Sequence, residues 1–313
     1  MKKILVVGSS NTDLIIKVPE IPRPGETLLG GVFQTFPGGK GANQAVAAAR
    51  AGGDVVFIAS VGDDTYGAEA VKGYKLDNIN TDNIKICKET PSGIAMITVS
   101  HKGENAITVA SGANSVLTSA DLDDAEEAFD EADMMLVQLE TPLETVAKAI
   151  DLCKELDTRV ILNPAPAAAL SDEILSGTDI ITPNETEAES LTGVSIKDEN
   201  DAGRAADILH EKGVRTVIIT MGARGAFVSD PASACRMLVP GFEAKAEDTT
   251  AAGDVFNGQL AVALAEGAPL QYAVQLAHAA AALSVQRMGA QSSIPKREET
   301  DSFLKQQLKK LTE

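Results

Sequence analysis

A stretch of small residues near the carboxyl end of the chain leads into a predicted helix and ends on a carboxylate. It reads Asp-Thr-Thr-Ala-Ala-Gly-Asp over residues 248–254, and the predicted helix covers Asp254–Glu266. Small residues at a helix start leave backbone N–H groups exposed, and the helix dipole adds positive potential there. The pattern predicts an anion site, in which Asp254 either caps the helix or acts as a base beside the anion.

A second glycine-rich stretch, Pro-Gly-Gly-Lys-Gly-Ala-Asn over residues 37–43, lies near the amino end. Glycines let the backbone approach a ligand closely, and the alanine-rich segment Gly41–Ala51 predicts a helix. The stretch is not a phosphate-binding Walker A loop, because no Ser or Thr follows Lys40. A plain turn before a helix explains the glycines, but it does not explain Lys40 and Asn43 on one helical turn.

Short apolar segments alternate with helical segments along the chain. The predicted strands are Ile4–Val7, Val55–Val61, Met134–Leu139, Val160–Leu162 and Val217–Thr220. The predicted helices are Gly41–Ala51, Thr65–Lys75, Ala120–Asp130, Leu143–Leu156, Ala202–Lys212, Asp254–Glu266 and Leu270–Arg287. This alternation predicts an α/β fold, a doubly wound and mostly parallel sheet with helices on both faces.

Two segments, about 13–36 and 84–110, interrupt the alternation within what we expect to be one domain spanning 1–313. They contain four short strand candidates, which are Leu14–Val18, Thr27–Phe36, Ile94–Ser100 and Ala106–Ala110. Four strands outside the main pattern predict a small separate sheet. We expect this sheet to form a lid over the site, a dimer contact, or both.

Composition excludes several classes of function. The 27 Lys and Arg residues against 45 Asp and Glu give a net charge of −18, which argues against nucleic-acid and anionic-membrane binding. The 3 cysteines are odd in number and widely separated, as expected in a reducing compartment. The apolar run after Met1 stops at Gly8, and no later run is long enough to span a bilayer. These features predict a cytoplasmic protein with a small-molecule substrate.

Together these motifs resemble those of the ribokinase-like (pfkB) carbohydrate kinases. Besides residues 38–43 and 248–254, the matching stretches are Asn-Pro-Ala-Pro-Ala at 163–167, Asn-Glu-Thr-Glu at 184–187 and Thr-Met-Gly-Ala-Arg-Gly at 220–225. All five occur in the family's order and cover essentially the whole chain. The resemblance implies a doubly wound sheet with a small β-sheet lid that also forms a homodimer contact. It further implies ATP-dependent phosphorylation of D-ribose at O5.

The resemblance also assigns roles to residues. Asp254 would be the general base, and the N–H groups of Ala251, Ala252 and Gly253 would form an anion hole for the transferring phosphoryl group. The implied sugar contacts are Asn11, Asp13, Gly39, Lys40, Asn43, Glu140 and Asp254. Asn11, Asp13 and Glu140 each follow a predicted strand, where open α/β sheets bind ligands, and we expect Asn11 and Asp13 to offer acceptors to sugar hydroxyls.

Two further groups of residues would bind the nucleotide and two ions. The implied ATP contacts are Asn184, Glu187, Thr220, Gly222, Gly225, Gly253 and His278. Glu187 would hold Mg²⁺, directly or through a water. The implied ligands of an activating monovalent cation such as K⁺ are Asp248, Thr250, Ser284, Arg287, Gly289 and Ser293, most of them through carbonyl groups.

Two alternatives stay open from the residues alone. The same chemistry could act on 2-deoxyribose, fructose or adenosine, although Asn11 and Asp13 favour a sugar with adjacent hydroxyls and 4% aromatic residues offer no obvious slot for a purine. The chain could also be a non-catalytic sugar-binding protein. Asp254, Gly253, Asn184 and Glu187 argue against this second alternative, because a pure binder needs no phosphoryl-transfer residues.

Overall fold

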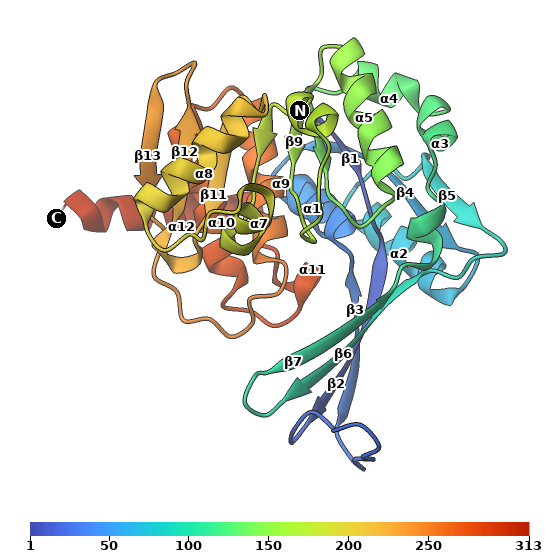
Figure 1. Ribbon diagram of the computed structural model, residues 1–313. Helices are drawn as coiled ribbons and strands as arrows, with labels where there is room; N and C mark the ends of the chain where they lie inside the picture. The colour runs from blue at the N-terminus through green and yellow to red at the C-terminus, as the bar shows by residue number, and fades with distance from the viewer. Residues whose placement is uncertain (313) are drawn as a thin grey trace.

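A nine-stranded sheet runs through the centre of the protein, and helices cover both of its faces (Figure 1). The computed structural model describes residues 1–312. In sheet order the strands are β13 (Cys235–Val239), β12 (Ala226–Asp230), β11 (Thr216–Thr220), β10 (Ile180–Ile181), β9 (Arg159–Leu162), β8 (Met134–Val137), β1 (Lys3–Val7), β4 (Asp54–Gly62) and β5 (Ile84–Cys87). All neighbours are parallel except β12, which pairs antiparallel with β11 and β13. The predicted doubly wound, mostly parallel sheet is confirmed.

Helices form a layer on each face of the large sheet. Packed on one face are α1 (Lys40–Arg50), α2 (Thr65–Leu76), α9 (Ala252–Ala265), α10 (Leu270–Ser284) and α12 (Arg297–Thr312), and on the other α3 (Ser119–Asp123), α4 (Glu126–Asp130), α5 (Leu143–Glu155), α6 (Asp172–Ser176), α7 (Glu185–Thr192) and α8 (Glu199–Glu211). In β1, Ile4 and Val6 face the first layer while Leu5 and Val7 face the second. Burial on both faces explains why this strand is uniformly apolar.

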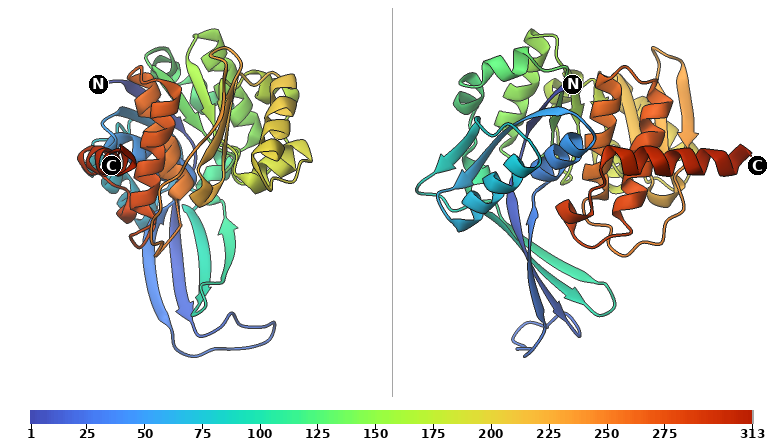
Figure 2. Two further views of the ribbon diagram at one scale, coloured as in Figure 1. Left: turned by 90° about the vertical axis from the view of Figure 1, so that its left-hand side faces the viewer. Right: turned by 180° about the vertical axis from the view of Figure 1, so that it is seen from behind.

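A second sheet projects from this body (Figures 1 and 2). Its order is β3 (Val32–Gly38), β2 (Asn11–Val18), β6 (Gly93–Ser100) and β7 (Asn105–Ala110). The predicted small separate sheet is therefore present. Segment Ile84–Cys87, at the start of the second interruption, instead pairs with β4 as an edge strand of the large sheet.

Several elements differ from the sequence-based expectation. The predicted helix Ala120–Asp130 is two short helices, α3 and α4, with Asp124 and Ala125 between them. The segment is densely acidic, and a second helix start at Glu126 lets carboxylates meet the positive end of a helix dipole instead of repelling one another along one helix. The antiparallel strands β12 and β13 were not predicted.

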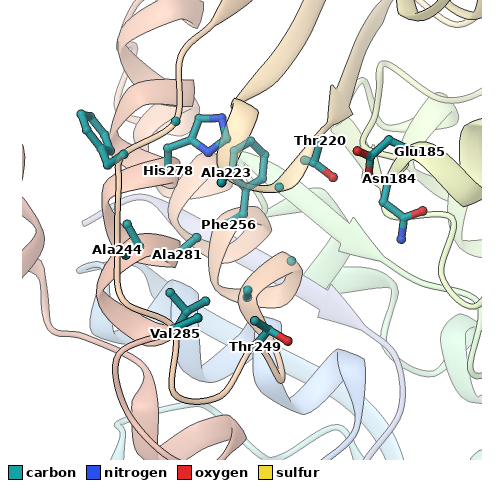
Figure 3. Close-up of a pocket in the computed structure, with 17 residues that line it drawn as sticks. Asn184, Glu185, Thr220, Ala223, Ala244, Thr249, Phe256, His278, Ala281 and Val285 are labelled. Carbon is teal, nitrogen blue, oxygen red and sulfur yellow. The ribbon is translucent and has the colours of Figure 1, made fainter. Parts of the chain in front are cut away.

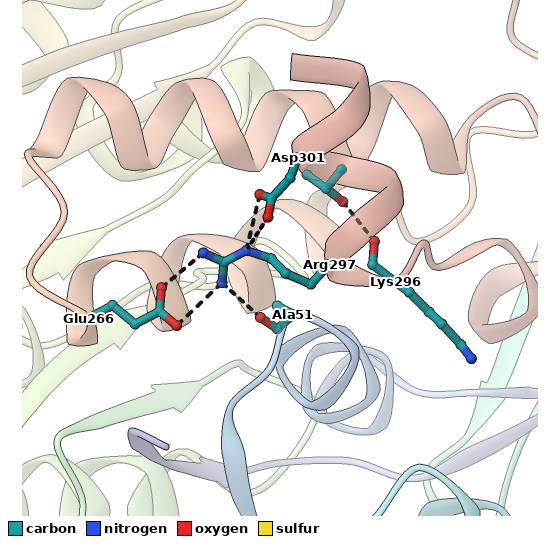
Figure 4. Close-up of polar contacts among 6 residues, drawn as sticks. Ala51, Glu266, Lys296, Arg297 and Asp301 are labelled. Atoms are coloured by element: carbon teal, nitrogen blue, oxygen red, sulfur yellow. Dashed lines mark hydrogen bonds and ion pairs between the residues drawn. The ribbon is translucent and has the colours of Figure 1, made fainter. Parts of the chain in front are cut away.

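The helices α1 and α9, whose amino ends carry the second and first motifs, pack against each other. Gly258 allows their close approach, because a Cβ there would lie 2.5 Å from Ala47 Cβ. At their far ends, Arg297 donates to the Ala51 carbonyl and pairs with Glu266 and Asp301 (Figure 4). This arginine ties the start of α12 to both helices. Among residues 1–312, no helix has the length and apolar character needed to cross a membrane.

Candidate active site

The first turn of α9 brings a carboxylate next to free backbone donors. Ala251 caps the helix in the left-handed region, at φ 61°. Within residues 1–312 the N–H groups of Ala251 and Gly253 have no hydrogen-bond partner, whereas that of Ala252 donates to the Thr249 carbonyl at 3.3 Å. The helix N-terminus that the sequence predicts to bind an anion therefore has two of its three predicted donors unengaged.

The Asp254 carboxylate is buried and held at both oxygens. Asn43 Nδ2 donates to Oδ2 at 3.0 Å, and Gln44 Nε2 donates to Oδ1 at 3.1 Å. Burial raises the pKa of Asp254, while the Lys40 ammonium and the two amide hydrogen bonds act in the opposite direction. The two motifs at opposite ends of the sequence therefore meet at one carboxylate.

Three carboxylates act on the buried Lys40 ammonium. Burial disfavours this charge, but Asp254, Glu140 and Glu187 outweigh burial and raise the pKa of Lys40. Burial also raises the pKa of Asp13 to about 6, with Glu140 and Asp254 adding to the rise. The site carries excess negative charge, and Lys40 is the cation that faces it.

The predicted sugar contacts Asn11 and Asp13 lie at the start of β2. Asn114 Nδ2 donates to Asn11 Oδ1 at 2.7 Å, and Asn114 is itself fixed by accepting from the Ser10 N–H at 2.8 Å. This bond occupies one of the two acceptor positions of Asn11 Oδ1, so the expectation that Asn11 offers an acceptor to a sugar stays a prediction. Within residues 1–312 the Asp13 carboxylate oxygens accept no hydrogen bond.

Close backbone contacts shape the same region. Gly39 caps α1 at φ 91°, a conformation that favours glycine, and a Cβ at Gly38 would lie 2.4 Å from the Asp13 carboxylate. Glu140 accepts from the Lys40 N–H at 3.0 Å and from the Ser9 hydroxyl at 2.5 Å. A cavity of about 360 Å³ opens beside Asn11 and Glu140.

A second cavity, of about 400 Å³, runs from the start of α9 to His278 (Figure 3). Its walls are mainly apolar and include Phe242, Ala244, Phe256, Ala281, Ala282 and Val285. Of the predicted nucleotide contacts, Asn184, Thr220, Gly222, Gly253 and His278 line it. His278 packs on Phe256 with ring centroids 5.1 Å apart. Burial lowers the pKa of His278 to about 4, so the ring is neutral at pH 7, and its buried Nε2 has no partner within residues 1–312.

The other two predicted nucleotide contacts, Glu187 and Gly225, do not line this cavity. Asn184 and Glu187 form a capping box at the start of α7, each side chain accepting from the other's N–H at 2.9 Å. Burial raises the pKa of Glu187. Gly225 permits a close backbone approach, since a Cβ there would lie 2.0 Å from the Val239 carbonyl oxygen.

The predicted cation ligands are partly gathered by Asp248. Its Oδ1 accepts from the N–H and hydroxyl of Thr250 at 2.9 and 2.6 Å, and its Oδ2 accepts from the Gly289 N–H at 2.9 Å. The Arg287 guanidinium pairs instead with Glu299, which leaves only its carbonyl for an ion. The hydroxyls of Ser284 and Ser293 donate to carbonyls within their own turns.

The sequence of residues 1–297 matches the pfkB family carbohydrate kinases. The chain belongs to the pfkB family. It is 48% identical over 303 residues to the ribokinase of Haemophilus influenzae, covering 97% of this chain and 98% of the relative. It is also 37% identical to the deoxyribokinase of Salmonella typhimurium, covering 96% and 98%. The structure of Arabidopsis thaliana ribokinase complexed with ribose and ATP superposes with a TM-score of 0.91 at 30% identity, covering 97% and 98%.

Several polar residues of this pfkB-family site escaped the sequence analysis. They are Ser9, Gln44, Asn114, Gln138, Asn163, Thr182 and Asn257, all buried or partly buried behind the predicted contacts. Gln44 directly follows the 37–43 motif and Asn163 begins the 163–167 motif, so these two were the most accessible to sequence reasoning. The others have no comparable motif of their own, and only the fold brings them together.

Proposed function

We propose that this pfkB-family carbohydrate kinase transfers the γ-phosphoryl group of ATP to O5 of D-ribose, giving D-ribose 5-phosphate and ADP. The observation that carries the proposal is the buried Asp254 carboxylate beside unengaged N–H groups at the start of α9. The ribokinase relative, at 48% identity over nearly all of both chains, supports D-ribose as the sugar.

In the proposed reaction, Asp254 accepts the proton of the O5 hydroxyl while that oxygen attacks the γ-phosphorus. The new O5–P bond forms as the bond from γ-phosphorus to the bridging oxygen breaks, and ADP leaves with that oxygen. The N–H groups of Ala251 and Gly253 would stabilise the transferring group, with Lys40 supplying positive charge. A general base contributes modestly, and most of the acceleration comes from positioning and charge stabilisation.

Sugar recognition is proposed to combine donors and acceptors. The Asn11 amide N–H groups and the Asp13 carboxylate are complementary to adjacent hydroxyls, with Gly39, Lys40, Asn43 and Glu140 completing the pocket. A site built for a hydroxyl rejects the deoxy sugar, because its buried polar groups are then unpaired. The deoxyribokinase relative makes 2-deoxyribose the main competing substrate.

ATP is proposed to occupy the cavity between α9 and α10. Apolar walls suit the adenine ring, and the unpartnered Nε2 of His278 can meet a polar edge of the base. The phosphates would then point to Gly253 at the other end, past Asn184, Thr220 and Gly222, with Gly225 shaping the loop.

Two ions complete the proposal. Within the described residues, no group of three or more His, Cys, Asp or Glu side chains could hold a metal, so Mg²⁺ would be held mainly by the nucleotide. Glu187 uses one oxygen in its capping box and would act through water. The Asp248, Thr250 and Gly289 cluster fits a weakly hydrated K⁺, joined by Ser293 and the carbonyls of Ser284 and Arg287.

We further propose a homodimer formed through the small sheet and a cytoplasmic location. Large apolar side chains are exposed on both faces of that sheet, namely Ile16, Val32, Phe33, Met96, Ile107 and Val109. Such a surface is typical of an interface. All three cysteines are unpaired, which agrees with a reducing compartment.

The proposal is tested by ADP release with ATP, Mg²⁺ and K⁺ against ribose, 2-deoxyribose, fructose and adenosine. We expect a clear preference for ribose; preference for another compound would replace ribose as the proposed substrate, and no turnover would favour the binding-protein alternative.

Asp254→Asn should lower kcat by about 10²- to 10⁴-fold while ribose binding, measured by calorimetry, persists. Near-normal turnover of this variant would refute the base assignment. Equal rates in Na⁺ and K⁺ would refute the cation site.

A further inference from the structure

Three buried side-chain amides link the Asp254 carboxylate to the carboxyl ends of β8 and β9. Gln44 Nε2 donates to Asp254 Oδ1 and to Asn163 Oδ1, both at 3.1 Å. Gln138 Nε2 donates to Gln44 Oε1 at 2.7 Å. Gln44 and Gln138 are essentially inaccessible, with 0% and 1% of their surface exposed. Every polar atom of the Gln44 amide is therefore used inside the protein.

Two groups that only accept hydrogen bonds set the direction of these amides. Asn163 Nδ2 donates to the Thr182 backbone carbonyl at 3.3 Å, so Asn163 turns its Oδ1 toward Gln44. The ionised Asp254 carboxylate also only accepts. Gln44 must present its NH₂ group to both, which leaves its Oε1 for Gln138.

Gln138 is held against the backbone of β1's end. A Cβ at Gly8 would lie 2.1 Å from Gln138 Oε1, so only glycine leaves room for this amide. Gln138 Oε1 has no partner within residues 1–312, which is an unfavourable environment for a buried carbonyl. An apolar side chain would suit packing here, so the amide is explained by its donation to Gln44.

We propose that Gln44 is a positioning residue for phosphoryl transfer, and that Gln138 fixes the direction of the Gln44 amide. The inference rests on the proposed function, in which Asp254 takes the O5 proton. Gln44 and Asn43 each hold one carboxylate oxygen, so the carboxylate cannot rotate freely. The same donation favours the ionised form that a base requires.

The other charged groups facing Asp254 come from three elements and a loop. They are Lys40 on α1, Glu140 after β8, Asp13 on β2 and Glu187 on α7. Of these, Lys40 favours the ionised carboxylate and the three acids oppose it. Burial and these acids already raise the pKa of Asp254, so removal of the Gln44 donor should raise it further.

The test is the pH profile of kcat at saturating ribose, because kcat reports groups in the substrate complex. Gln44→Met keeps the size and burial of the side chain and removes the donor. We expect kcat to fall about tenfold or more, the KM for ribose to change less than about threefold, and the acidic limb to move up by about one pH unit. Gln138→Met should move the limb in the same direction by less, since Gln44 can then turn.

The double variant should be no worse than Gln44→Met alone, because both changes act on one interaction. Gln259→Met is the matched control, a buried glutamine on α9 whose Nε2 has no partner among the residues that the structure describes. Its acidic limb should equal that of the wild type. An unmoved limb in Gln44→Met, or an equal shift in the control, would overturn the proposal. If Gln44→Met does not fold, the acidic limb of Gln138→Met is the test: an upward shift supports the proposal, and an unmoved limb overturns it. Wild-type protein without ribose turnover would instead refute the proposed function.

Discussion

The excess of carboxylates around Lys40 determines how single residues of the site respond to pH. Asp13 is a buried carboxylate, and burial together with the charges of Glu140 and Asp254 raises its pKa to about 6. It is thus ionised at pH 7 and becomes protonated as the pH falls through 6. Protonation removes an acceptor that the proposed ribose contact uses.

Ribose affinity should therefore fall about tenfold between pH 7 and pH 5. Calorimetry on Asp254→Asn removes the titration of Asp254 itself, and because the Asp254 charge adds to the rise in the Asp13 pKa, the fall in this variant should lie at a somewhat lower pH. The double variant Asp13→Asn/Asp254→Asn should bind ribose more weakly, with no dependence on pH over this range. An affinity that depends equally on pH in both variants would exclude Asp13 as the group responsible.

Asn114 offers a prediction about the direction of one amide. Asn114→Asp keeps the acceptor for the Ser10 N–H but cannot donate to Asn11, which is then free to turn. The KM for ribose should rise about tenfold, since one oriented hydrogen bond to the sugar is lost. Asn200→Asp, at an exposed position of α8 that lines neither cavity, makes the same change of charge and serves as the control. Equal KM values for the two variants would refute this role.

Among single residues, the sequence best predicted those that lie inside short motifs. Asn43 and Asp254 are 211 positions apart, yet their motifs suggested one site, and the structure joins them by a hydrogen bond. Asn114 and Gln138 could not be predicted in this way. Each is an ordinary polar residue after a strand, and its role depends on which distant segment the fold places beside it.

At the scale of elements, the periodicity of apolar residues predicted the central strands well. It failed for the acidic segment 120–130, where electrostatics rather than hydrophobic pattern interrupts the helix, and for β12 and β13, whose antiparallel pairing departs from the regular alternation. The small sheet was predictable because two segments interrupted that alternation. Its position on the body was not, because register depends on contacts between distant segments.

Arg297 provides a stability prediction for the elements that carry the site. Arg297→Met removes the bond to the Ala51 carbonyl and both carboxylate partners, which should lower the free energy of unfolding by about 1–2 kcal/mol in chemical denaturation. Arg204→Met breaks only an exposed pair with Asp201 and should cost less than about 0.5 kcal/mol. Similar losses of unfolding free energy in the two variants would show that the Arg297 contacts between α1, α9 and α12 stabilise the protein no more than an exposed ion pair does.

For the whole molecule, the exposed apolar residues of the small sheet predict association. Phe33 and Ile107 lie on opposite faces of that sheet, with exposed fractions of 62% and 56%. We expect the wild type to sediment as a dimer, and Phe33→Asp or Ile107→Asp to yield monomers, depending on which face forms the contact. Leu76→Asp, an exposed apolar residue on α2, should remain dimeric. A monomeric wild type, or a dimer insensitive to both sheet substitutions, would refute the interface.

Strand β2 has a geometric consequence that reaches beyond the site. Its first residues, Asn11 and Asp13, lie at the proposed sugar pocket, whereas Val18 lies at the far end of the projecting sheet. At about 3.3 Å per residue, five residues form a lever arm of about 17 Å. A rotation of about 10° at the root would displace the tip by about 3 Å over that length. A fluorescent or spin label on the loop after Val18 would therefore report a small rotation at the sugar pocket as a larger displacement of the tip.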